Sequence, residues 1–575
     1  MRVLALLLSF IALTWALPAI HVKGNKFFDN TGKQFYVVGL DYQPSVALND
    51  DPIADSEGLK RDLPYLTGLG INIIRVYSAD ATLNHDAGMK MLSDAGIYVL
   101  FDATDKLFSI NPRDPSWSLD LFTHIKAKID ALRGYDNVFG FLVGNEVIIN
   151  GWGDTVAAPY LKASIRDAKA YLKSVGSSAL VGYAATDIDA NGPLQQYLDC
   201  KSIATSVDFY GINTYRWCNG DDYKSASYAL FNKPYDAPVV FTEFGCIREK
   251  PRQFKEVQAI FGIMNQTLSG GFAYEYSQED NNYGIVQISN NQVTTFGDYT
   301  NLQTQYKNLN LQYLTESSYN VDPTAVLSCP QPDGQWLGIS DPLPPAADSD
   351  YCQCMMNTLQ CTVNPSASSA SISGAVGTAC GGVSCAEINA NSSTATYGKF
   401  SACTSVQRSS YAINQYYIAN KDSQGSDACN FNGVGQIVAN PKGCSSIVTS
   451  VPTKTASASK SATASSSASQ SASASSSASQ SATASQVVSA TAVVVEGNVT
   501  QTATVSSSKS ASVTRTNSVS ASLTQTNSVS ASLTQSATQT DQGQNRYNTQ
   551  WDEAFGSASS TLPLLGLVVV VLMSI

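Results

Sequence analysis

Runs of apolar, strand-like residues alternate with helix-favouring stretches through about the first 330 residues of the chain. The runs read, in order, QFYVVGLDY, INIIRVYS, IYVLFDAT, NVFGFLVGNEV, ALVGYAA, SVDFYGINTY, APVVFTEFG and GGFAYEYS. Eight such runs, most of them separated by amphipathic or helix-favouring segments, match a (β/α)8 barrel better than an open sheet. We therefore predict an α/β fold, a TIM barrel, over residues 17–335.

An apolar segment lies at each end of the chain. The first, MRVLALLLSFIALTWALPAI, has one Arg, an apolar stretch and a small residue at Ala16, which is typical of a secretory signal peptide over residues 1–16. The last, LPLLGLVVVVLMSI, is shorter than the roughly 20 residues that span a bilayer as a helix. It favours a GPI-anchor signal over residues 556–575, attached at Gly556 or, as second choice, Ser557. A tail that itself anchors or loosely binds the membrane is the alternative.

Two further regions follow the predicted barrel. Residues 346–447 come after the Pro-rich SDPLPPAADSD and hold eight of the twelve cysteines, which predicts a module stapled by up to four disulfides among 105 possible pairings. Residues 450–555 are rich in Ser, Thr and Ala, and the unit SSSASQSASA recurs as SSSASQSATA. Such tracts cannot bury enough apolar surface to fold, so we predict a disordered, O-glycosylated stalk.

Charge and composition exclude several classes of function. The 35 basic and 46 acidic residues give a net charge of −11 without a basic cluster, which argues against a nucleic-acid partner. Only three histidines occur, and no HExxH or CxxC pair with metal-ligand spacing accompanies them. We therefore predict no metal, no other cofactor and no Ser-His-Asp triad, and we expect the twelve cysteines of a secreted chain to form disulfides.

Polar residues stand at the ends of most predicted strands, where a barrel of this type places its active site. They comprise Asp41, Tyr42, Gln43, Tyr77, Asp102, Asn145, Glu146, Tyr215, Glu243, Tyr274, Glu275 and Tyr276. Carboxylates, amides and aromatic rings are the groups that hold a sugar, through its hydroxyls and its ring faces. From this set we predict substrate contacts at Gln43, Tyr77, Asp102, Asn145, Tyr215 and Tyr274. The alternatives are half-buried barrel tyrosines and an Asp102 that supports another residue.

Glu146 and Glu243 are the candidate catalytic pair. They are 97 positions apart, which is three βα units and places them on opposite sides of the barrel mouth. Two carboxyls about 5 Å apart act as acid/base and nucleophile in retaining glycosyl transfer, and a charged nucleophile raises the pKa of its neighbour. We predict Glu146 as the acid/base, with Asn145 holding the sugar 2-hydroxyl, and Glu243 as the nucleophile. Ordinary rim carboxylates are the alternative reading, and Glu275 is the competing nucleophile, although it alternates with two tyrosines that share the other side.

The motifs resemble those of a known family. GLDYQP, IIRVYSADATLNHD, FLVGNEV, YGINTYRWC, FTEFGC and GGFAYEYSQEDNNYGIVQ occur in order over nearly the whole barrel. They resemble the fungal GPI-anchored β-1,3-glucanosyltransferases of glycoside hydrolase family 72. YCQCMMNTLQC and YGKFSAC resemble the eight-cysteine carbohydrate-binding module, family 43, that follows the barrel in one branch of that family.

The resemblance implies an activity. The enzyme cleaves an internal β-1,3-glucan bond, holds the fragment as an ester on Glu243 and transfers it to the non-reducing end of a second β-1,3-glucan, which elongates cell-wall glucan. We therefore expect a secreted monomer at the cell surface, whose partners are a donor and an acceptor glucan. Its GPI anchor holds it in the plasma membrane, or the protein is passed on to the wall.

The resemblance also assigns residues. Glu146 takes the acid/base role and Glu243 that of the nucleophile. Donor contacts are implied at Tyr77, Asn145, Tyr274 and the loop from Thr104 through Ser109 to Asn111, an acceptor-side contact at Asp187, and disulfides between Cys200 and Cys329 and between Cys218 and Cys246. Two departures stand out: the NHD helix lacks the family's cysteine, and no Arg follows Asp187, so we expect a remodelled acceptor side.

Two other functions remain open from the sequence. One is an endo-β-1,3-glucanase, which releases shorter products without making longer ones. The other is a catalytically silent wall-binding protein displayed on the stalk, against which the intact pair of glutamates argues. The cysteine-rich module is either a glucan platform or a structural cap on the barrel.

Overall fold

The computed structural model describes residues 16–44, 51–218, 235–322 and 327–444, and the backbone of strands β18 (Thr491–Glu496) and β19 (Val499–Thr504). Those two strands pair with each other in a unit of their own. Residues 1–15 of the predicted signal peptide, most of the stalk and the predicted anchor signal with Gly556 lie outside the described residues. Within the described ranges, no helix is long and apolar enough to cross a membrane.

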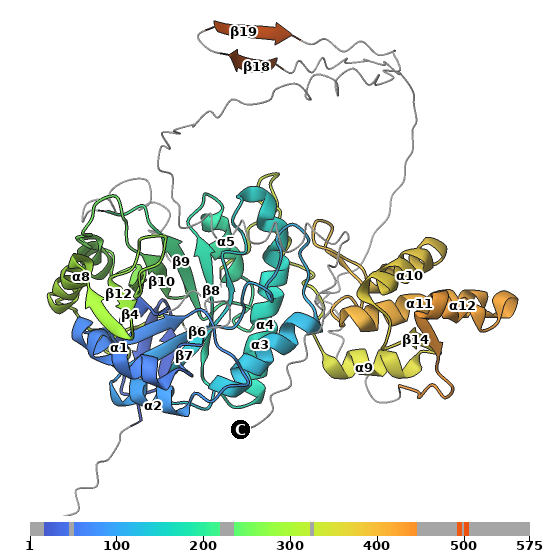
Figure 1. Cartoon of the computed structure of the whole chain (residues 1–575), viewed down its shortest axis with the longest axis horizontal. Coiled ribbons are helices and arrows are strands. Elements are labelled where there is room, and N and C mark those ends of the chain that lie inside the picture. Colours follow the sequence, from blue (N-terminus) through green and yellow to red (C-terminus); the bar gives the residue numbers. More distant parts are fainter. Residues whose placement is uncertain are drawn as a thin grey trace, which may run out of the picture. The chain divides into compact units, whose positions relative to one another are not determined.

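Eight parallel strands close into a barrel surrounded by helices (Figure 1). Every strand neighbours the next one along the chain, in the order β10-β11-β4-β5-β6-β7-β8-β9. The strands are β4 (Val37–Asp41), β5 (Ile73–Val76), β6 (Tyr98–Asp102), β7 (Val138–Asn145), β8 (Leu180–Thr186), β9 (Phe209–Thr214), β10 (Val239–Phe244) and β11 (Leu268–Ala273). Each overlaps one of the eight predicted runs; β8 ends one residue after its run and β11 begins two residues before its run. The predicted (β/α)8 barrel is confirmed.

Helices connect the strands on the outside of the barrel (Figure 1). They are α1 (Ser56–Leu69), α2 (Asp86–Asp94), α3 (Leu119–Leu132), α4 (Ala158–Ser174), α5 (Asn191–Leu198), α7 (Glu256–Gln258) and α8 (Gly297–Lys307). Local sequence sets the ends of α1: Asp55 accepts a hydrogen bond from the Gly58 N–H, and Gly70 ends the helix at φ 81°. A hairpin, β12 (Val286–Ser289) and β13 (Gln292–Thr295), precedes α8.

An antiparallel sheet of β1 (Ile20–Lys23), β2 (Lys26–Asp29) and β3 (Gln34–Phe35) contributes to an apolar cluster inside the barrel. Phe27 of β2 is fully buried, and its ring lies edge-on 5.1 Å from that of Phe139 and 6.0 Å from that of Phe209. The floor of the barrel is therefore a packed hydrophobic core, which leaves polar chemistry to the opposite end.

The cysteine-rich segment forms a small helical module. Its elements are α9 (Ser349–Thr358), β14 (Cys361–Val363), α10 (Ser369–Gly382), β15 (Ala390–Asn391), β16 (Thr396–Tyr397), α11 (Ser405–Gln424), α12 (Asp427–Asn430) and β17 (Gly435–Ile437). Its disulfides are Cys352–Cys403, Cys354–Cys444, Cys361–Cys429 and Cys380–Cys385. Two more disulfides lie outside the module, Cys200–Cys329 and Cys218–Cys246. They are the two pairs that the family resemblance implies.

The module contacts the barrel at the start of α3. The Leu119 N–H donates to the Ala402 carbonyl at 2.8 Å. Asp120 accepts from the backbone N–H and the hydroxyl of Ser405 at 2.8 and 3.1 Å. Ser405 is the first residue of α11, so a barrel carboxylate caps a module helix, an arrangement that stabilises the positive end of the helix dipole.

We expect Phe27→Ala to lower the free energy of unfolding by about 3–5 kcal/mol, because truncation removes apolar contacts and leaves a cavity in the barrel floor. Urea titration monitored by circular dichroism measures the loss. The control is Ile263→Ala, whose side chain is 59% exposed and whose loss we expect below about 1 kcal/mol. Equal losses in the two variants would contradict a packed floor.

Candidate active site

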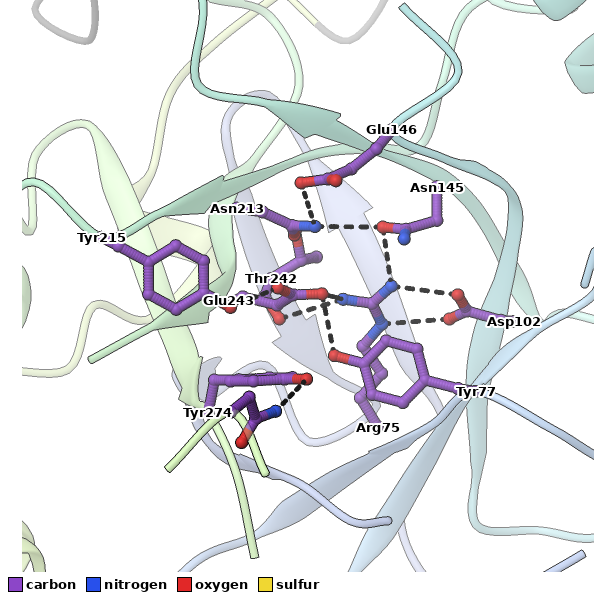
Figure 2. Close-up of polar contacts among 11 residues, drawn as sticks. Arg75, Tyr77, Asp102, Asn145, Glu146, Asn213, Tyr215, Thr242, Glu243 and Tyr274 are labelled. Carbon is purple, nitrogen blue, oxygen red and sulfur yellow. Dashed lines mark hydrogen bonds and ion pairs between the residues drawn. The ribbon is translucent and has the colours of Figure 1, made fainter. Parts of the chain in front are cut away.

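Arg75 of β5 lies at the centre of the barrel mouth, fully buried (Figure 2). A guanidinium has five N–H donors, and each finds an acceptor here. Nε and Nη2 donate to the two oxygens of Asp102 at 3.0 and 2.9 Å. Nη1 donates to Glu243 Oε1 at 3.0 Å and to the Thr242 carbonyl at 3.2 Å, and Nη2 also donates to Asn145 Oδ1 at 3.0 Å. This one cation therefore fixes residues from three other strands.

Sequence reasoning missed Arg75, because it lies inside the strand IIRVYS and not at its end. The available signal was a charged residue within a strand that is otherwise buried. Such a residue requires buried partners of opposite charge.

Glu243 of β10 is buried, with 6% of the residue exposed. Besides Arg75, it accepts hydrogen bonds from the Tyr77 hydroxyl at 2.8 Å on Oε1 and from the Tyr215 hydroxyl at 2.5 Å on Oε2. Burial raises the pKa of Glu243, and Arg75 and the two hydroxyls oppose that rise. An anion held by three donors is suited to attack an electrophilic carbon from a fixed position.

Glu146 follows β7 in a left-handed backbone conformation, φ 52°, which is uncommon outside glycine. Its N–H donates to the Ala184 carbonyl of β8 at 2.8 Å, which holds this turn in place. The side chain points into the mouth, where Asn213 Nδ2 of β9 donates to Glu146 Oε1 at 3.0 Å (Figure 2). Glu146 is half-buried, so a substrate oxygen can reach it.

A chain of hydrogen bonds links the two glutamates (Figure 2). Asn213 Nδ2 donates to Glu146 and also to Asn145 Oδ1 at 3.1 Å, and Asn145 Oδ1 in turn accepts from Arg75, which binds Glu243. The Thr242 hydroxyl donates to Asn213 Oδ1 at 2.7 Å and thereby sets the orientation of that amide. Asn213 and Thr242 were also missed, because both lie within strand runs.

Three tyrosine rings form one wall beside Glu243. The ring centroids of Tyr215, Tyr274 and Tyr283 lie 5.0 to 5.8 Å apart in edge-on arrangements. On the other side the Arg75 guanidinium lies 4.2 Å from the centroid of the Tyr77 ring. Aromatic faces of this kind pack against sugar rings. Tyr283 was missed because it stands in a loop between NN and GIVQ, without a strand-end signal.

The other predicted contacts are bonded elsewhere. Gln43 Nε2 donates to Glu279 Oε1 at 3.0 Å. Asn111 accepts from the N–H of Arg113 at 3.0 Å. Within the same predicted loop Thr104 is buried, and Ser109 and Asn111 are partly exposed.

Asp187 is paired within the protein. Its Oδ2 accepts from the Thr214 hydroxyl at 2.6 Å, and its Oδ1 accepts from Arg216 Nη2 at 2.6 Å. No Arg follows Asp187 in its own loop, but the loop after β9 supplies one.

Two further acids are buried close to the pair. Asp41 of β4 is in register with Arg75, and neither of its carboxyl oxygens has a hydrogen-bond partner among the described residues. Burial raises the pKa of Asp41 well above its usual range, and the charge of Arg75 opposes that rise.

Burial also raises the pKa of Glu275 to about 8, while Asn281 Nδ2 donates to its Oε1 at 2.7 Å. A carboxyl that is neutral at pH 7 is a poor nucleophile, which favours Glu243 over Glu275 in that role. In the described part of the chain, no three His, Cys, Asp or Glu side chains gather as a metal site would require.

A (β/α)8 barrel with glutamates at the ends of its fourth and seventh strands, among amides and tyrosines, defines an enzyme that processes glycosides. Residues 9–310 match the family model described as "Glucanosyltransferase", and residues 359–436 match that of the X8 domain. The chain belongs to this glucanosyltransferase family, family 72 of the glycoside hydrolases.

Several known proteins are similar to this chain over most of their length. The 1,3-beta-glucanosyltransferase gas1 of Schizosaccharomyces pombe is 37% identical over 434 residues, which cover 73% of this chain and 79% of that protein. Protein EPD1 of Candida maltosa is 37% identical over 447 residues, 76% of this chain and 81% of that protein. The structure of Saccharomyces cerevisiae Gas2p in complex with laminaripentaose matches with a TM-score of 0.66 at 35% identity, and covers 73% of this chain and 98% of that one.

We expect Arg75→Lys to lower the free energy of unfolding by about 3–5 kcal/mol, because three ammonium donors cannot serve five acceptors and buried carboxylates lose partners. We also expect cleavage of a β-1,3-gluco-oligosaccharide to slow by about 100-fold or more, because Glu243 loses its position. Urea titration and initial rates measure the two effects. Arg133→Lys is the control, because Arg133 forms an ion pair with Asp130 at the surface. Its stability and its initial rate should both stay near wild type. A fully active Arg75→Lys would overturn this assignment.

Glu275→Gln tests the raised pKa. The unfolded chain loses this proton near pH 4.3 and the folded chain near pH 8, so wild type loses stability as pH rises between these values. Gln cannot ionise, so the variant should gain on the order of 4–5 kcal/mol relative to wild type between pH 4 and pH 8. Urea titrations at both pH values measure this gain. The exposed Glu57→Gln should show none, and a gain equal to that control would exclude a neutral Glu275.

Proposed function

We propose that this protein is a retaining β-1,3-glucanosyltransferase in which Glu243 is the nucleophile and Glu146 the acid/base. The observation that carries the proposal is the hydrogen-bonded chain from Glu146 through Asn213, Asn145 and Arg75 to Glu243. It presents two carboxyls to one space in different environments, as a double-displacement reaction requires. Membership of the glucanosyltransferase family supports the transfer of a sugar chain to another sugar.

In the first step Glu146 gives its proton to the glycosidic oxygen while a Glu243 oxygen attacks the anomeric carbon. The bond between that carbon and the glycosidic oxygen breaks, and the leaving glucan departs with the proton. An ester between Glu243 and the donor fragment remains. Arg75, Tyr77 and Tyr215 hold the attacking carboxylate throughout.

Asn145 is positioned to bind the donor sugar. Its Oδ1 accepts from both Arg75 and Asn213, which fixes the amide orientation. Its Nδ2 makes no hydrogen bond to the described part of the protein and is available to a sugar hydroxyl. A bond to the 2-hydroxyl that strengthens in the transition state stabilises the developing charge.

In the second step Glu146, now a carboxylate, takes the proton of an acceptor hydroxyl, whose oxygen attacks the anomeric carbon. The ester bond to Glu243 breaks, and two inversions restore the β configuration. When the acceptor is the non-reducing end of another β-1,3-glucan, the product is longer than the donor. The structures of Saccharomyces cerevisiae Gas2p in complex with laminaritriose and laminaritetraose, and with laminaripentaose, support this substrate class.

The proposed place of action is the cell surface, for a monomer secreted by its signal peptide and held by a GPI anchor. The two terminal segments support this proposal by their composition alone. A glycosylated stalk between anchor and enzyme gives the barrel reach into a surrounding glucan layer.

The test incubates the protein with a reduced β-1,3-gluco-oligosaccharide and follows product sizes by mass spectrometry. We expect wild type to form products longer than the substrate, and Glu146→Gln and Glu243→Gln to lose at least about 1,000-fold of this activity. Glu57→Gln on the surface of α1 is the matched control and should retain it. Shorter products alone would identify a hydrolase, and no products from folded wild type would favour a wall-binding protein.

A donor with a nitrophenyl leaving group separates the two roles, because its departure needs no proton. Glu146→Gln should then release nitrophenol in a burst and stall at the ester, whereas Glu243→Gln should stay inactive. A burst from Glu243→Gln would show that another group is the nucleophile.

A further inference from the structure

Arg216 and Asp187 form an ion pair that lies outside the network around Arg75. Arg216 Nη2 donates to Asp187 Oδ1 at 2.6 Å and to the Asp187 carbonyl oxygen at 2.9 Å. The Asp187 side chain is only 3% exposed, whereas that of Arg216 is 44% exposed. The carboxylate is therefore an internal anchor, and the guanidinium is the part that faces solvent.

The segment that carries Arg216 is held on both sides. Before it, the Thr214 hydroxyl donates to Asp187 Oδ2 at 2.6 Å. After it, Trp217 is buried with its ring 5.1 Å from that of Phe241, and Cys218 is bonded to Cys246 in the loop after β10. Arg216 is thus an exposed side chain on a fixed backbone, which lowers the entropy lost when it binds a ligand.

Most of the guanidinium is unused. Both of its hydrogen bonds come from Nη2, and Nε and Nη1 have no acceptor within the described part of the protein. The contacts of Nη2 are enough for Arg216 to serve as the partner of the buried Asp187 carboxylate. The remaining donors point to a ligand with acceptor oxygens, such as a sugar with adjacent hydroxyls.

The position of Arg216 in the order of the barrel strands indicates whether its ligand is the donor or the acceptor sugar. Glu146 follows β7, Asp187 follows β8, Arg216 follows β9 and Glu243 ends β10, so the ion pair occupies the arc between the two glutamates. Most of the groups that hold Glu243 and the donor come from the opposite arc of β5, β6 and β11, namely Arg75, Tyr77, Asp102 and Tyr274. Asn145 at the end of β7 and Tyr215 after β9 complete this set from strands of the arc between the two glutamates.

The chemistry of the reaction then indicates which sugar lies at the arc between the two glutamates. Glu146 exchanges its proton with the oxygen that joins the donor sugar to the sugar leaving or arriving on the other side. That second sugar must lie beside Glu146 and beyond the donor pocket. The strand ends next to Glu146 on that side are those of β8 and β9, which carry Asp187 and Arg216.

We propose that Arg216, anchored by Asp187, binds hydroxyl groups of the acceptor glucan and thereby favours transfer over hydrolysis. The inference rests on the proposed function, because only a transferase has an acceptor sugar. By orienting the incoming hydroxyl toward Glu146, Arg216 raises the effective concentration of the sugar over that of water at the ester on Glu243. The ester is then resolved by the acceptor oxygen, which leaves its proton on Glu146.

The experiment uses the full-length protein, a reduced β-1,3-gluco-oligosaccharide donor and a fluorescently labelled acceptor oligosaccharide at increasing concentration. Transfer and hydrolysis products are counted separately. In Arg216→Gln we expect the ratio of transfer to hydrolysis to fall about tenfold and the acceptor KM to rise by a similar factor, the effect of losing one charged hydrogen bond. High acceptor concentration should restore transfer, and Arg216→Lys should fall in between.

Controls separate binding from folding. Arg133→Gln removes a surface arginine of similar exposure that also pairs with an aspartate, and its ratio should match wild type. Because Arg216→Gln leaves Asp187 without its cation, Asp187→Asn/Arg216→Gln is measured as well, and it should show the same loss of transfer.

An unchanged ratio in both Arg216 variants overturns the proposal. An equal loss of transfer and hydrolysis, without a rise in the acceptor KM, also overturns it and makes Arg216 a structural residue. Absence of longer products from wild type itself is a different result, because it refutes the proposed transferase before Arg216 is tested.

Discussion

A single buried cation organises the barrel mouth. The guanidinium of Arg75 has no contact with water, so each of its five donors must find an acceptor inside the protein, and the acceptors come from β6, β7 and β10. The same requirement works in reverse, because Asp102 and Glu243 are buried carboxylates that need this cation. The positions of Asn145 and Glu243 are therefore set together, before any substrate arrives.

The two glutamates differ because their surroundings differ. Glu243 is buried and held by a guanidinium and two phenol hydroxyls, which leaves it little freedom to move. Glu146 is half-buried on a left-handed turn, where it accepts a hydrogen bond from the Asn213 amide and is accessible to a substrate oxygen. A held anion suits the nucleophile, and an accessible carboxyl suits the group that moves protons. Similar side chains thus acquire different chemistry from their burial and partners.

Polar groups at the mouth carry a cost in stability that the rest of the fold must offset. Asp41 and Glu275 lie buried there with raised pKa values, and each is less stable in the folded protein once ionised. The aromatic floor around Phe27 and the six disulfides of the barrel and module provide stabilisation far from the chemistry. Asp120, which caps α11, shows that the cysteine-rich module also has a structural contact with the barrel.

The sequence by itself determined the barrel and the candidate pair Glu146 and Glu243. Apolar runs of strand length, and polar residues at their ends, are local patterns that do not depend on contacts between distant positions. Arg75, Asn213 and Thr242 were not predicted, because their roles depend on contacts between distant positions; Arg75 and Glu243 are 168 residues apart. The sequence also did not predict the four disulfide pairings within the module or the ion pair between Asp187 and Arg216. Only the closed barrel decides these, because it brings separate strand ends to one low-dielectric space where every charge needs a partner.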